Sequence, residues 1–366
     1  MLNNTNKLNW VKNITSMFMI GLLLVVIPTF TQDANSVKAA EEEGTIGTVE
    51  DISQDGSDVY IDLSTGEGIK ISFLKDNLFR LHLDPEKKFP DYPEPNSPDH
   101  GTKIIDKNES EYKDEYGSIV VSVEENSEFH KIVTDAVELR IEKETSKMSL
   151  YDKNQSKILW EEAAPLKYEN NKAVQTLSTN EDEYFYGGGQ QNGYYSHKNE
   201  SINISVGGGW DAGGASSPVP FYLSTDGYGV MRNTFKPGFY DFSATATFEH
   251  AEERFDAYYF VEDSIPDIIN EYTELTGSPA LLPKFAFYLG HLDCFNGTHN
   301  GHGDERTLMV DGMNYLNRYV GNDMPLGWFA PNDGYGCGYS GLDNLEEFAD
   351  AAKEENVTTE IGRAHV

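Results

Sequence analysis

The sequence predicts two successive folds: an antiparallel β-sandwich over residues 41–262, then a β/α segment in which strands alternate with helices. Short runs of alternating apolar and polar residues recur from Gly44 to about Phe260, a pattern typical of antiparallel strands. Helical spacing of apolar residues first appears at Asp263, where this alternation ends. The 366 residues, 38% of them hydrophobic, are sufficient for more than one core.

Residues 1–40 show the order of features that is typical of a secretory signal peptide. Lys7 and Lys12 precede an apolar run from Met17 to Phe30, and small residues end the segment at Ala40. The alternative is a membrane anchor, but the run is shorter than the ~20 apolar residues that a membrane span requires. We therefore expect cleavage after Ala40, secretion to the extracellular space or the cell surface, and no membrane partner after cleavage.

The charge of the chain excludes one class of partner. It carries 61 acidic and 28 basic residues, a formal net charge of −33. Because this charge repels phosphate backbones, which are bound by clustered Lys and Arg, we expect no nucleic-acid partner. The chain contains two cysteines, Cys294 and Cys337, which an oxidising exterior would allow to pair. The sequence does not decide whether they do.

Within the sandwich, the alternation predicts antiparallel sheets with one solvated face. The acidic stretch from Asp106 to Gly117 lies between two predicted strands, and we interpret it as a solvated surface loop. The alternative for this stretch, a metal-binding role, is less favoured. The predicted strands are residues 58–63, 68–74, 78–83, 117–123, 136–142 and 148–152.

The stretch from Tyr184 to Phe242 combines many glycines and aromatic residues with few charges. Because glycine weakens a strand unless the backbone must turn or approach another group closely, this composition favours a loop that holds a ligand. A sugar fits, since aromatic rings stack on pyranose C–H faces while amide, carboxylate and imidazole groups meet its hydroxyls. The alternative is a glycine-rich hairpin region whose tyrosines only pack the sandwich. Trp210 and Asp211, flanked by glycines, are the residues for which we most favour ligand contact.

A linking helix is predicted to open the second part of the chain, within residues 263–280. Asp263 and Ser264 precede Pro266 at its start, and Gly277 marks its end. After the prolines that follow, the apolar run at 285–290 predicts a buried strand.

Further helices and a second strand are predicted to follow. The segment 304–320 places Met309, Met313, Leu316 and Val320 on one helical face. A strand follows in "PLGWFA", and a helix over 343–355 is predicted to be capped by Asp343. This alternation of strands and helices implies parallel crossovers.

The run "IPDIINEYTELTGSPALLPKFAFYLG", residues 265–290, resembles the junction in glycoside hydrolase family 31, where a helix leads through prolines into the first barrel strand. The resemblance implies a galactose-mutarotase-like β-sandwich over residues 41–262 and the first units of a truncated (β/α)8 TIM barrel over residues 281–366. It also implies a retaining, exo-acting enzyme on α-linked sugars, with an oligosaccharide or glycoside as partner and no cofactor.

Two phrases depart from the family pattern and indicate a divergent bacterial branch. They are "YGGGQQNG" at residues 186–193 and "APNDGYGCGY" at residues 330–339. The resemblance favours an α-glucosidase or α-glucosyltransferase. The alternatives are an α-N-acetylgalactosaminidase or α-galactosidase of the same family, and a non-catalytic carbohydrate-binding sandwich.

The resemblance also implies the residues that contact the sugar. The carboxyl ends of the first two barrel strands carry Asp293, Asn332 and Asp333, and these residues are expected to line the subsite for the terminal sugar. For Asp333 the alternative is a turn, because Asn-Asp-Gly is a strong turn former. Trp210 and Asp211, on the sandwich loop that the family extends over the barrel mouth, are expected to contact the aglycone side.

A cluster of metal-ligand residue types, which includes His291, follows the first barrel strand. Its other members, Cys294, His299, His302 and Asp304, are irregularly spaced among glycines, so we predict no metal site.

The reaction of this family needs two carboxyl groups about 5 Å apart, and the resemblance places both on later barrel strands. A barrel takes ~250 residues, whereas the segment from Lys284 to Val366 covers about two of its β/α units. We therefore expect no catalytic residue in this chain and an inactive fragment. The last seven residues, "EIGRAHV" (360–366), match a translated sequencing adapter and replace the expected third strand, so we expect an assembly artefact; the alternative is a natural terminus.

Overall fold

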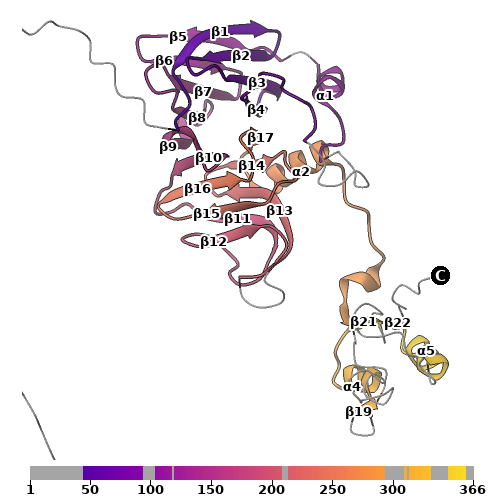
Figure 1. Cartoon of the computed structure of the whole chain (residues 1–366). Coiled ribbons are helices and arrows are strands. Elements are labelled where there is room, and N and C mark those ends of the chain that lie inside the picture. Colours follow the sequence, from indigo (N-terminus) through magenta and orange to yellow (C-terminus); the bar gives the residue numbers. More distant parts are fainter. Residues whose placement is uncertain are drawn as a thin grey trace, which may run out of the picture. The chain divides into compact units, whose positions relative to one another are not determined.

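The computed structural model describes residues 44–93, 104–117, 119–207, 213–292, 309–310, 313–330 and 345–359 (Figure 1). Within these ranges the strands form two large antiparallel sheets, one small parallel sheet and one two-stranded hairpin. The predicted signal peptide, residues 1–40, lies outside them. None of the described helices has the length and the apolar character that crossing a bilayer requires.

An antiparallel sheet, here called the first sheet, forms one layer of the sandwich. Three predicted strands are confirmed in it, because the runs at 58–63, 68–74 and 78–83 pair as β2, β3 and β4. In the described residues its strand order is β1 (Val49–Asp55), β2 (Asp58–Leu63), β3 (Gly68–Lys75), β4 (Leu78–Asp84), β17 (Phe255–Val261), β14 (Tyr228–Arg232), β13 (Ala215–Ser224) and β11 (Phe185–Gln191).

The second sheet is also antiparallel and confirms the strands predicted at 136–142 and 148–152. The strand predicted at 117–123 is wrong over its first part: Gly117 ends a helix, and strand pairing begins only at Ser122. In the described residues the order is β12 (Ser201–Ile204), β15 (Gly238–Asp241), β16 (Thr245–His250), β10 (Lys172–Ser178), β9 (Lys157–Glu169), β8 (Met148–Asp152), β7 (Val137–Glu142), β6 (Phe129–Val133) and β5 (Ser122–Glu125).

The main apolar core lies between the two sheets. Alternate residues of β4, namely Phe79, Leu81 and Leu83, are fully buried in it, as the period of two requires. Tyr222 of β13 and Phe248 of β16 stack with their ring centroids 4.5 Å apart and so join one sheet to the other. Packing between the sheets therefore uses the aromatic residues that the sequence concentrates in the second half of the sandwich.

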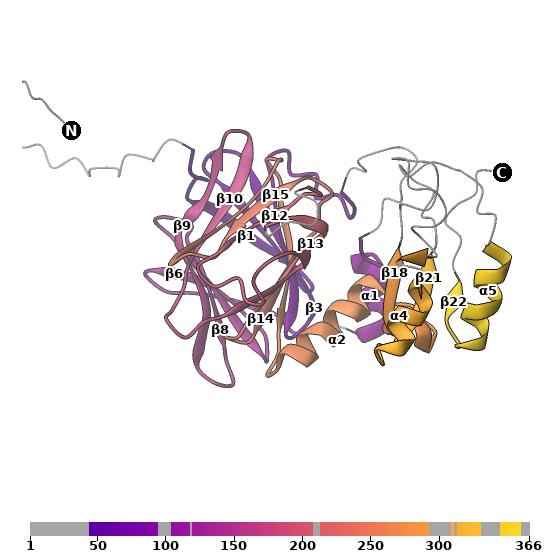
Figure 2. The ribbon, with the colours of Figure 1, turned by 90° about the horizontal axis from the view of Figure 1, so that it is seen from below.

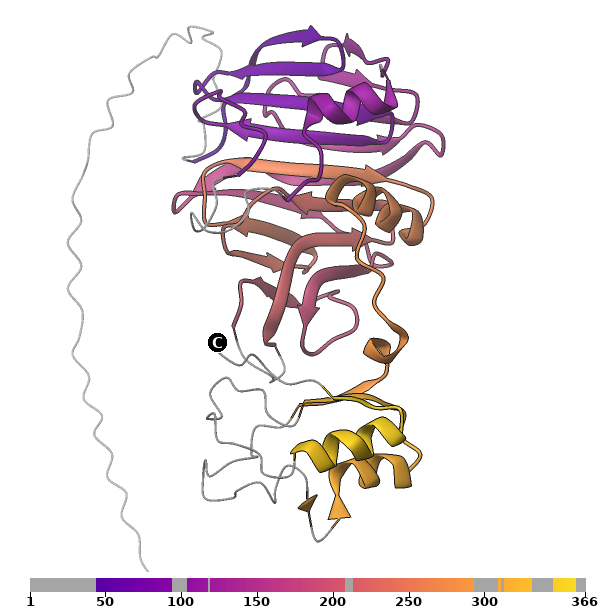
Figure 3. The same cartoon turned by 90° about the vertical axis from the view of Figure 1, so that its right-hand side faces the viewer.

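The outer face of the first sheet is covered as well. Every residue of β4 and β17 is buried, so the expectation of one solvated face is wrong for these strands. Helices α1 (Glu109–Tyr116) and α2 (Ile265–Thr276) pack on this face (Figures 2 and 3). An apolar cluster that includes Tyr112 of α1 and Ile268 of α2 holds the helices against the strands.

The ends of α2 confirm the predicted linking helix. The Ser264 hydroxyl accepts a hydrogen bond from the Asp267 backbone N–H at 3.3 Å, and Pro266 occupies the first turn, where no backbone N–H is needed. Gly277 follows the last helical residue with φ +93°, which favours glycine.

The prediction of a solvated loop at residues 106–117 is wrong, because most of this stretch forms α1. Its start is fixed by a capping box, in which Asn108 and Glu111 exchange side-chain to backbone hydrogen bonds of 2.9 Å each. The first helical residue, Glu109, is buried against the sheet. A buried carboxylate needs charged partners, and these come from distant strands.

Arg80 of β4 is the centre of a buried ion network. Its guanidinium donates to both carboxylate oxygens of Asp256 at 2.7 Å and to Glu109 at 2.6 Å. Glu109 also accepts from Lys70 at 2.7 Å and from Ser72 at 3.0 Å. Burial alone would raise the pKa of Glu109, but the charges of Arg80 and Lys70 outweigh it and lower the pKa to about 2. The network therefore ties α1 to β3, β4 and β17 through ionised carboxylates.

The C-terminal part confirms the predicted parallel crossovers. Strand β18 (Leu289–Leu292) pairs in parallel with β21 (Leu326–Ala330), which pairs in parallel with β22 (Thr358–Thr359). Helix α4 (Tyr315–Gly321) precedes β21, and α5 (Leu345–Glu354) precedes β22. Strand β22 is thus the third strand of this parallel sheet. It ends at Thr359, directly before residues 360–366, which were expected to stand in place of a third strand.

Two local expectations for this part are wrong. The run at 285–290 is not a buried strand, because a 3₁₀ turn occupies Lys284–Phe287, the strand begins at Leu289, and Phe287 is 67% exposed. Among the described residues of the segment 304–320, the helix begins at Tyr315. Met309–Val310 (β19) and Met313–Asn314 (β20) form a hairpin, and the intervening Asp-Gly dipeptide is a strong hairpin former.

We predict that Asp256→Asn destabilises the fold by about 3–5 kcal/mol, because it leaves the buried Arg80 charge without its bidentate partner. The free energy of unfolding from urea denaturation measures this. The matched control is Asp62→Asn, since the Asp62 carboxylate is 53% exposed where it pairs with Lys87. Its urea midpoint should stay almost unchanged. Equal effects of the two substitutions would contradict the role given to the network.

Candidate functional site

The predicted sugar-contacting residues lie outside the described residues. These are Trp210, Asp211, Asp293, Asn332 and Asp333. The same holds for Cys294 and Cys337, so their pairing remains a prediction. The structure does describe the segments on either side of these residues, and it shows how each predicted loop is anchored.

The loop that carries Trp210 and Asp211 is closed at its base by backbone pairing. Gly207 and Ala215 exchange two hydrogen bonds, with N–O distances of 3.1 and 2.9 Å. These bonds hold the end of β12 and the start of β13 beside each other. The connection between the two strands therefore leaves and re-enters the sandwich at one place.

A second connection supports this loop from the side. Asn192, in the connection from β11 to β12, donates its backbone N–H to Gly214 and accepts from the N–H of Gly213, both at 2.8 Å. The segment "YFYGGGQQNGYYSHKN" (184–199) and the glycine-rich loop after β12 are therefore neighbours in space. No local sequence pattern reports these bonds, because they join residues about twenty positions apart.

The consecutive glycines of the segment 184–199 lie in a strand and not in a loop. This corrects, for these residues, the prediction of a loop that holds a ligand. Gly187, Gly188 and Gly189 have φ values of +104°, +74° and +75° within the bulged strand β11. A Cβ atom on Gly189 would lie 2.3 Å from the Ser217 carbonyl oxygen of β13. Glycine is needed here for a left-handed backbone and for close approach between strands.

The tyrosines of this region divide between the two interpretations. Tyr222, Tyr228 and Tyr240 are fully buried and pack the sandwich. Tyr194 and Tyr195 are instead 68% and 92% exposed, on the connection that supports the glycine-rich loop. Large exposed aromatic side chains beside a glycine-rich loop are suited to contact a ligand.

The parallel sheet shows where the strands that precede the other predicted residues end. Leu292 of β18 pairs with Ala330 of β21, so both strands end at the same level. Asp293 follows the first of these ends, and Asn332 and Asp333 follow the second. Just before the edge, His291 stacks on Phe329 at 4.4 Å and shares a 2.7 Å hydrogen bond with the Tyr319 hydroxyl. His291 is thus used in packing. The other members of the cluster, Cys294, His299, His302 and Asp304, lie outside the described residues, so the absence of a metal site there stays a prediction.

Buried carboxyl groups with raised pKa values occur in the sandwich, but they are enclosed. Burial raises the pKa of Glu162 to about 8, and its oxygens accept hydrogen bonds from Gln175 and from the Met148 backbone at 2.9 Å. Burial also raises the pKa of Glu183, which Ser224 and Tyr228 contact. Raised pKa values often mark catalytic acids. With 0% and 3% exposure, however, neither side chain is accessible to a substrate.

Comparison with protein families gives a match to the glycosyl hydrolase 31 N-terminal galactose mutarotase-like domain over residues 68–241. An alpha-xylosidase of Emericella nidulans is 29% identical over 154 residues, which are 40% of this chain and 18% of that protein. An alpha-xylosidase of Saccharolobus solfataricus is 34% identical over 71 residues, 19% of this chain and 10% of that protein. The chain thus matches less than a fifth of the length of either curated relative.

Solved structures share the fold. A mutant of a family 31 dextranase from Flavobacterium johnsoniae, complexed with isomaltotriose, aligns with a TM-score of 0.67 and 16% identity over 87% of this chain and 38% of that one. A cycloalternan-forming enzyme from Listeria monocytogenes, in complex with a pentasaccharide substrate, gives 0.60 and 17% over 87% and 32%. A family 31 alpha-xylosidase from a soil metagenome, complexed with xylose, gives 0.56 and 18% over 85% and 47%.

We predict that Gly189→Ala destabilises the protein by more than about 3 kcal/mol, because the new methyl group would overlap backbone atoms of β13 that cannot move aside. Gly213→Ala is the matched control. Its φ of +81° is similar, but its Cβ would meet nothing within 4 Å, so only the cost of the left-handed backbone remains, about 1–2 kcal/mol. Urea denaturation measures both, and a similar loss for the two variants would show that strand approach is not the constraint.

Proposed function

Since the chain belongs to glycoside hydrolase family 31, we propose that it forms part of a secreted retaining enzyme that hydrolyses or transfers α-linked sugars. The observation that carries this proposal is the match of residues 68–241 to the N-terminal domain of the family, on a chain that folds as the corresponding β-sandwich. The structural alignment over 87% of this chain covers 38% of the dextranase chain. The activity is therefore proposed for a longer protein, whose catalytic carboxylates lie outside this chain.

An α-glucoside is the proposed substrate, as in an α-glucosidase or α-glucosyltransferase. The complexes of structural relatives with isomaltotriose and with a pentasaccharide substrate support an oligosaccharide ligand. An α-xyloside is the second candidate, because both curated relatives are named alpha-xylosidases. An α-galactoside or α-N-acetylgalactosaminide is the remaining alternative.

The parallel strands β18, β21 and β22, with α4 and α5 between them, are proposed as the opening of the (β/α)8 barrel. In that fold the substrate binds at the carboxyl ends of the strands. Asp293, Asn332 and Asp333 are then proposed to accept hydrogen bonds from the hydroxyls of the terminal sugar. The polar groups of a retaining glycosidase hold this sugar while one carboxylate attacks the anomeric carbon and a second carboxyl group protonates the departing oxygen.

The glycine-rich loop is proposed to meet the aglycone side of the substrate through Trp210 and Asp211. The backbone bonds of Asn192 to Gly213 and Gly214 support a further sugar contact, outside the loop itself. They hold the connection that carries Tyr195 beside Gly213 and Gly214. The exposed ring of Tyr195 is proposed to stack on a second sugar unit.

The complete protein encoded at the genomic locus should hydrolyse an aryl α-glycoside, whereas residues 41–366 alone should not. Aryl α-glucoside, α-xyloside, α-galactoside and α-N-acetylgalactosaminide are assayed side by side, and we expect turnover of the α-glucoside. Asp333→Asn should lower kcat/KM at least about a hundredfold, since a hydroxyl contact with a charged group is lost in the transition state. Asp350→Asn, on an exposed position of α5, is the matched control.

Absence of turnover on all four substrates by a folded complete protein would contradict the hydrolase proposal and leave the carbohydrate-binding alternative. Turnover by residues 41–366 alone would contradict the proposed position of the catalytic carboxylates.

Tyr195→Ala is predicted to raise the KM of the complete enzyme for an oligosaccharide about five- to tenfold, which corresponds to about 1.0–1.4 kcal/mol. The aryl monosaccharide, which lacks a second sugar unit, should be affected much less. Tyr195→Phe retains the ring and should restore most of the affinity. Because Tyr195 is 92% exposed, neither substitution should change the free energy of unfolding appreciably. An unchanged KM for Tyr195→Ala would exclude the stacking role.

A further inference from the structure

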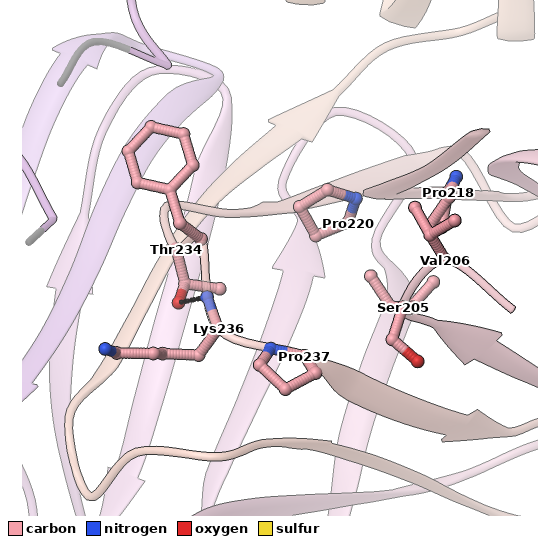
Figure 4. A pocket seen from close by; sticks show the side chains of 9 residues that line it. Ser205, Val206, Pro218, Pro220, Thr234, Lys236 and Pro237 are labelled. Carbon is pink, nitrogen blue, oxygen red and sulfur yellow. Dashed lines mark hydrogen bonds between the residues drawn. The ribbon is translucent and has the colours of Figure 1, made fainter. Parts of the chain in front are cut away.

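A cavity of about 360 Å³ lies beside the base of the glycine-rich loop (Figure 4). Its wall comes from three segments: the end of β12 with the two residues that follow it, the middle of β13, and the connection from β14 to β15. Among the described residues, neither Tyr194 nor Tyr195 lines it. Its volume is within the range of small-molecule sites, about 300–1,000 Å³.

The wall of this cavity is largely apolar and rigid. Pro218, Pro220 and Pro237 line it, and their rings lose no side-chain freedom when a ligand binds. In Figure 4, Pro220 and Pro237 lie opposite each other, with Thr234 and Lys236 on one side of them and Ser205 and Val206 on the other. These rigid C–H-rich rings, held on β13 and on the connection from β14 to β15, form a preshaped surface for another C–H-rich ring.

Hydrogen-bonding groups at this surface are available to a ligand. Within the described part of the chain, the Ser205 hydroxyl and the Lys236 ammonium have no hydrogen-bond or ion-pair partner. Thr234 differs, because its hydroxyl accepts the backbone N–H of Lys236 at 3.0 Å. An apolar site with a few unused polar groups is the usual composition of a site for a small polar molecule.

We propose that this cavity binds one neutral pyranose unit of an oligosaccharide, as a subsite additional to the residues at the barrel edge. The proline rings would pack on the C–H face of the sugar, while Ser205 and Lys236 would donate hydrogen bonds to its hydroxyls. A neutral sugar is favoured over an acidic one, because the formal charge of −33 repels anionic glycans.

Continuity of the backbone supports this occupant. The strands that form the cavity wall, β12 and β13, are the two arms of the loop that carries Trp210 and Asp211. This inference rests on the proposed function in one respect, namely that the substrate is an oligosaccharide. The segment made of β12, the loop and β13 would then contact both the aglycone side of the reacting bond and a more distant sugar unit.

The test uses the whole chain with valine methyl groups labelled for NMR and isomaltotriose as the probe. Val206 lines the cavity and is 80% exposed, so its signal, identified by its absence in Val206→Trp, should shift on titration. Val120, 78% exposed and outside the cavity, is the matched control, and its signal should not move. The indole of Val206→Trp should fill the cavity and raise the Kd for isomaltotriose at this site at least about tenfold. Val120→Trp should change it less than twofold.

A Val206 signal that does not move at saturating isomaltotriose, or that moves no more than the Val120 signal, would overturn the proposal. Kinetics of the complete enzyme distinguish a failure of the proposed cavity subsite from a failure of the proposed enzymatic function. If Val206→Trp lowers kcat/KM for the oligosaccharide but not for an aryl monosaccharide, the subsite is supported. If the complete enzyme has no turnover while the Val206 signal still responds to the sugar, the activity fails and the binding site stands.

Discussion

The buried guanidinium of Arg80 is the constraint on which the architecture of the sandwich depends. A charge with 1% exposure is tolerated only when its donors are met, and Asp256, Glu109 and the Pro90 carbonyl meet them. Each of these partners belongs to a different segment of the chain. One side chain therefore fixes β17 beside β4, seats α1 on the sheet, and holds the segment after β4 over the same face.

This arrangement makes the middle of the first sheet different from its β11 edge. In the middle, ion pairs and apolar contacts from α1 and α2 close the outer face, and Tyr272 of α2 stacks on Phe221 of β13 at 4.0 Å. At the β11 edge, β11 and β13 approach each other through glycines and continue into connections with exposed tyrosines. Rigid packing in one region thus supports the presentation of side chains in the other, as expected when binding residues lie on loops of a stable scaffold.

The proposed sugar contacts share this scaffold. Backbone bonds of Asn192 and Gly207 position the glycine-rich loop, and the same strands form the wall of the proline-lined cavity. A neutral, extended carbohydrate suits these features together: rings for its C–H faces, scattered donors for its hydroxyls, and an acidic protein that excludes polyanions. Because the loop and the cavity would contact different sugar units, they would give selectivity for the length of the oligosaccharide rather than for a single sugar.

The sequence by itself determined the elements whose signals are local. Alternation predicted strands of the first and second sheets, Ser264 and Gly277 predicted the ends of α2, and the phrase at residues 265–290 predicted the family. Only the tertiary structure decided that the acidic stretch at 106–117 is a helix with a buried Glu109, because its stability depends on Arg80 and Lys70 of distant strands. The same holds for the glycines of β11, which are required because β13 approaches them closely. It also holds for the backbone bonds that bring the connection after β11 beside Gly213 and Gly214. For the residues expected to bind the terminal sugar, the sequence gives a prediction by resemblance. Local patterns encode propensity and periodicity, whereas burial, charge pairing and close approach are properties of partners that only the folded chain brings together.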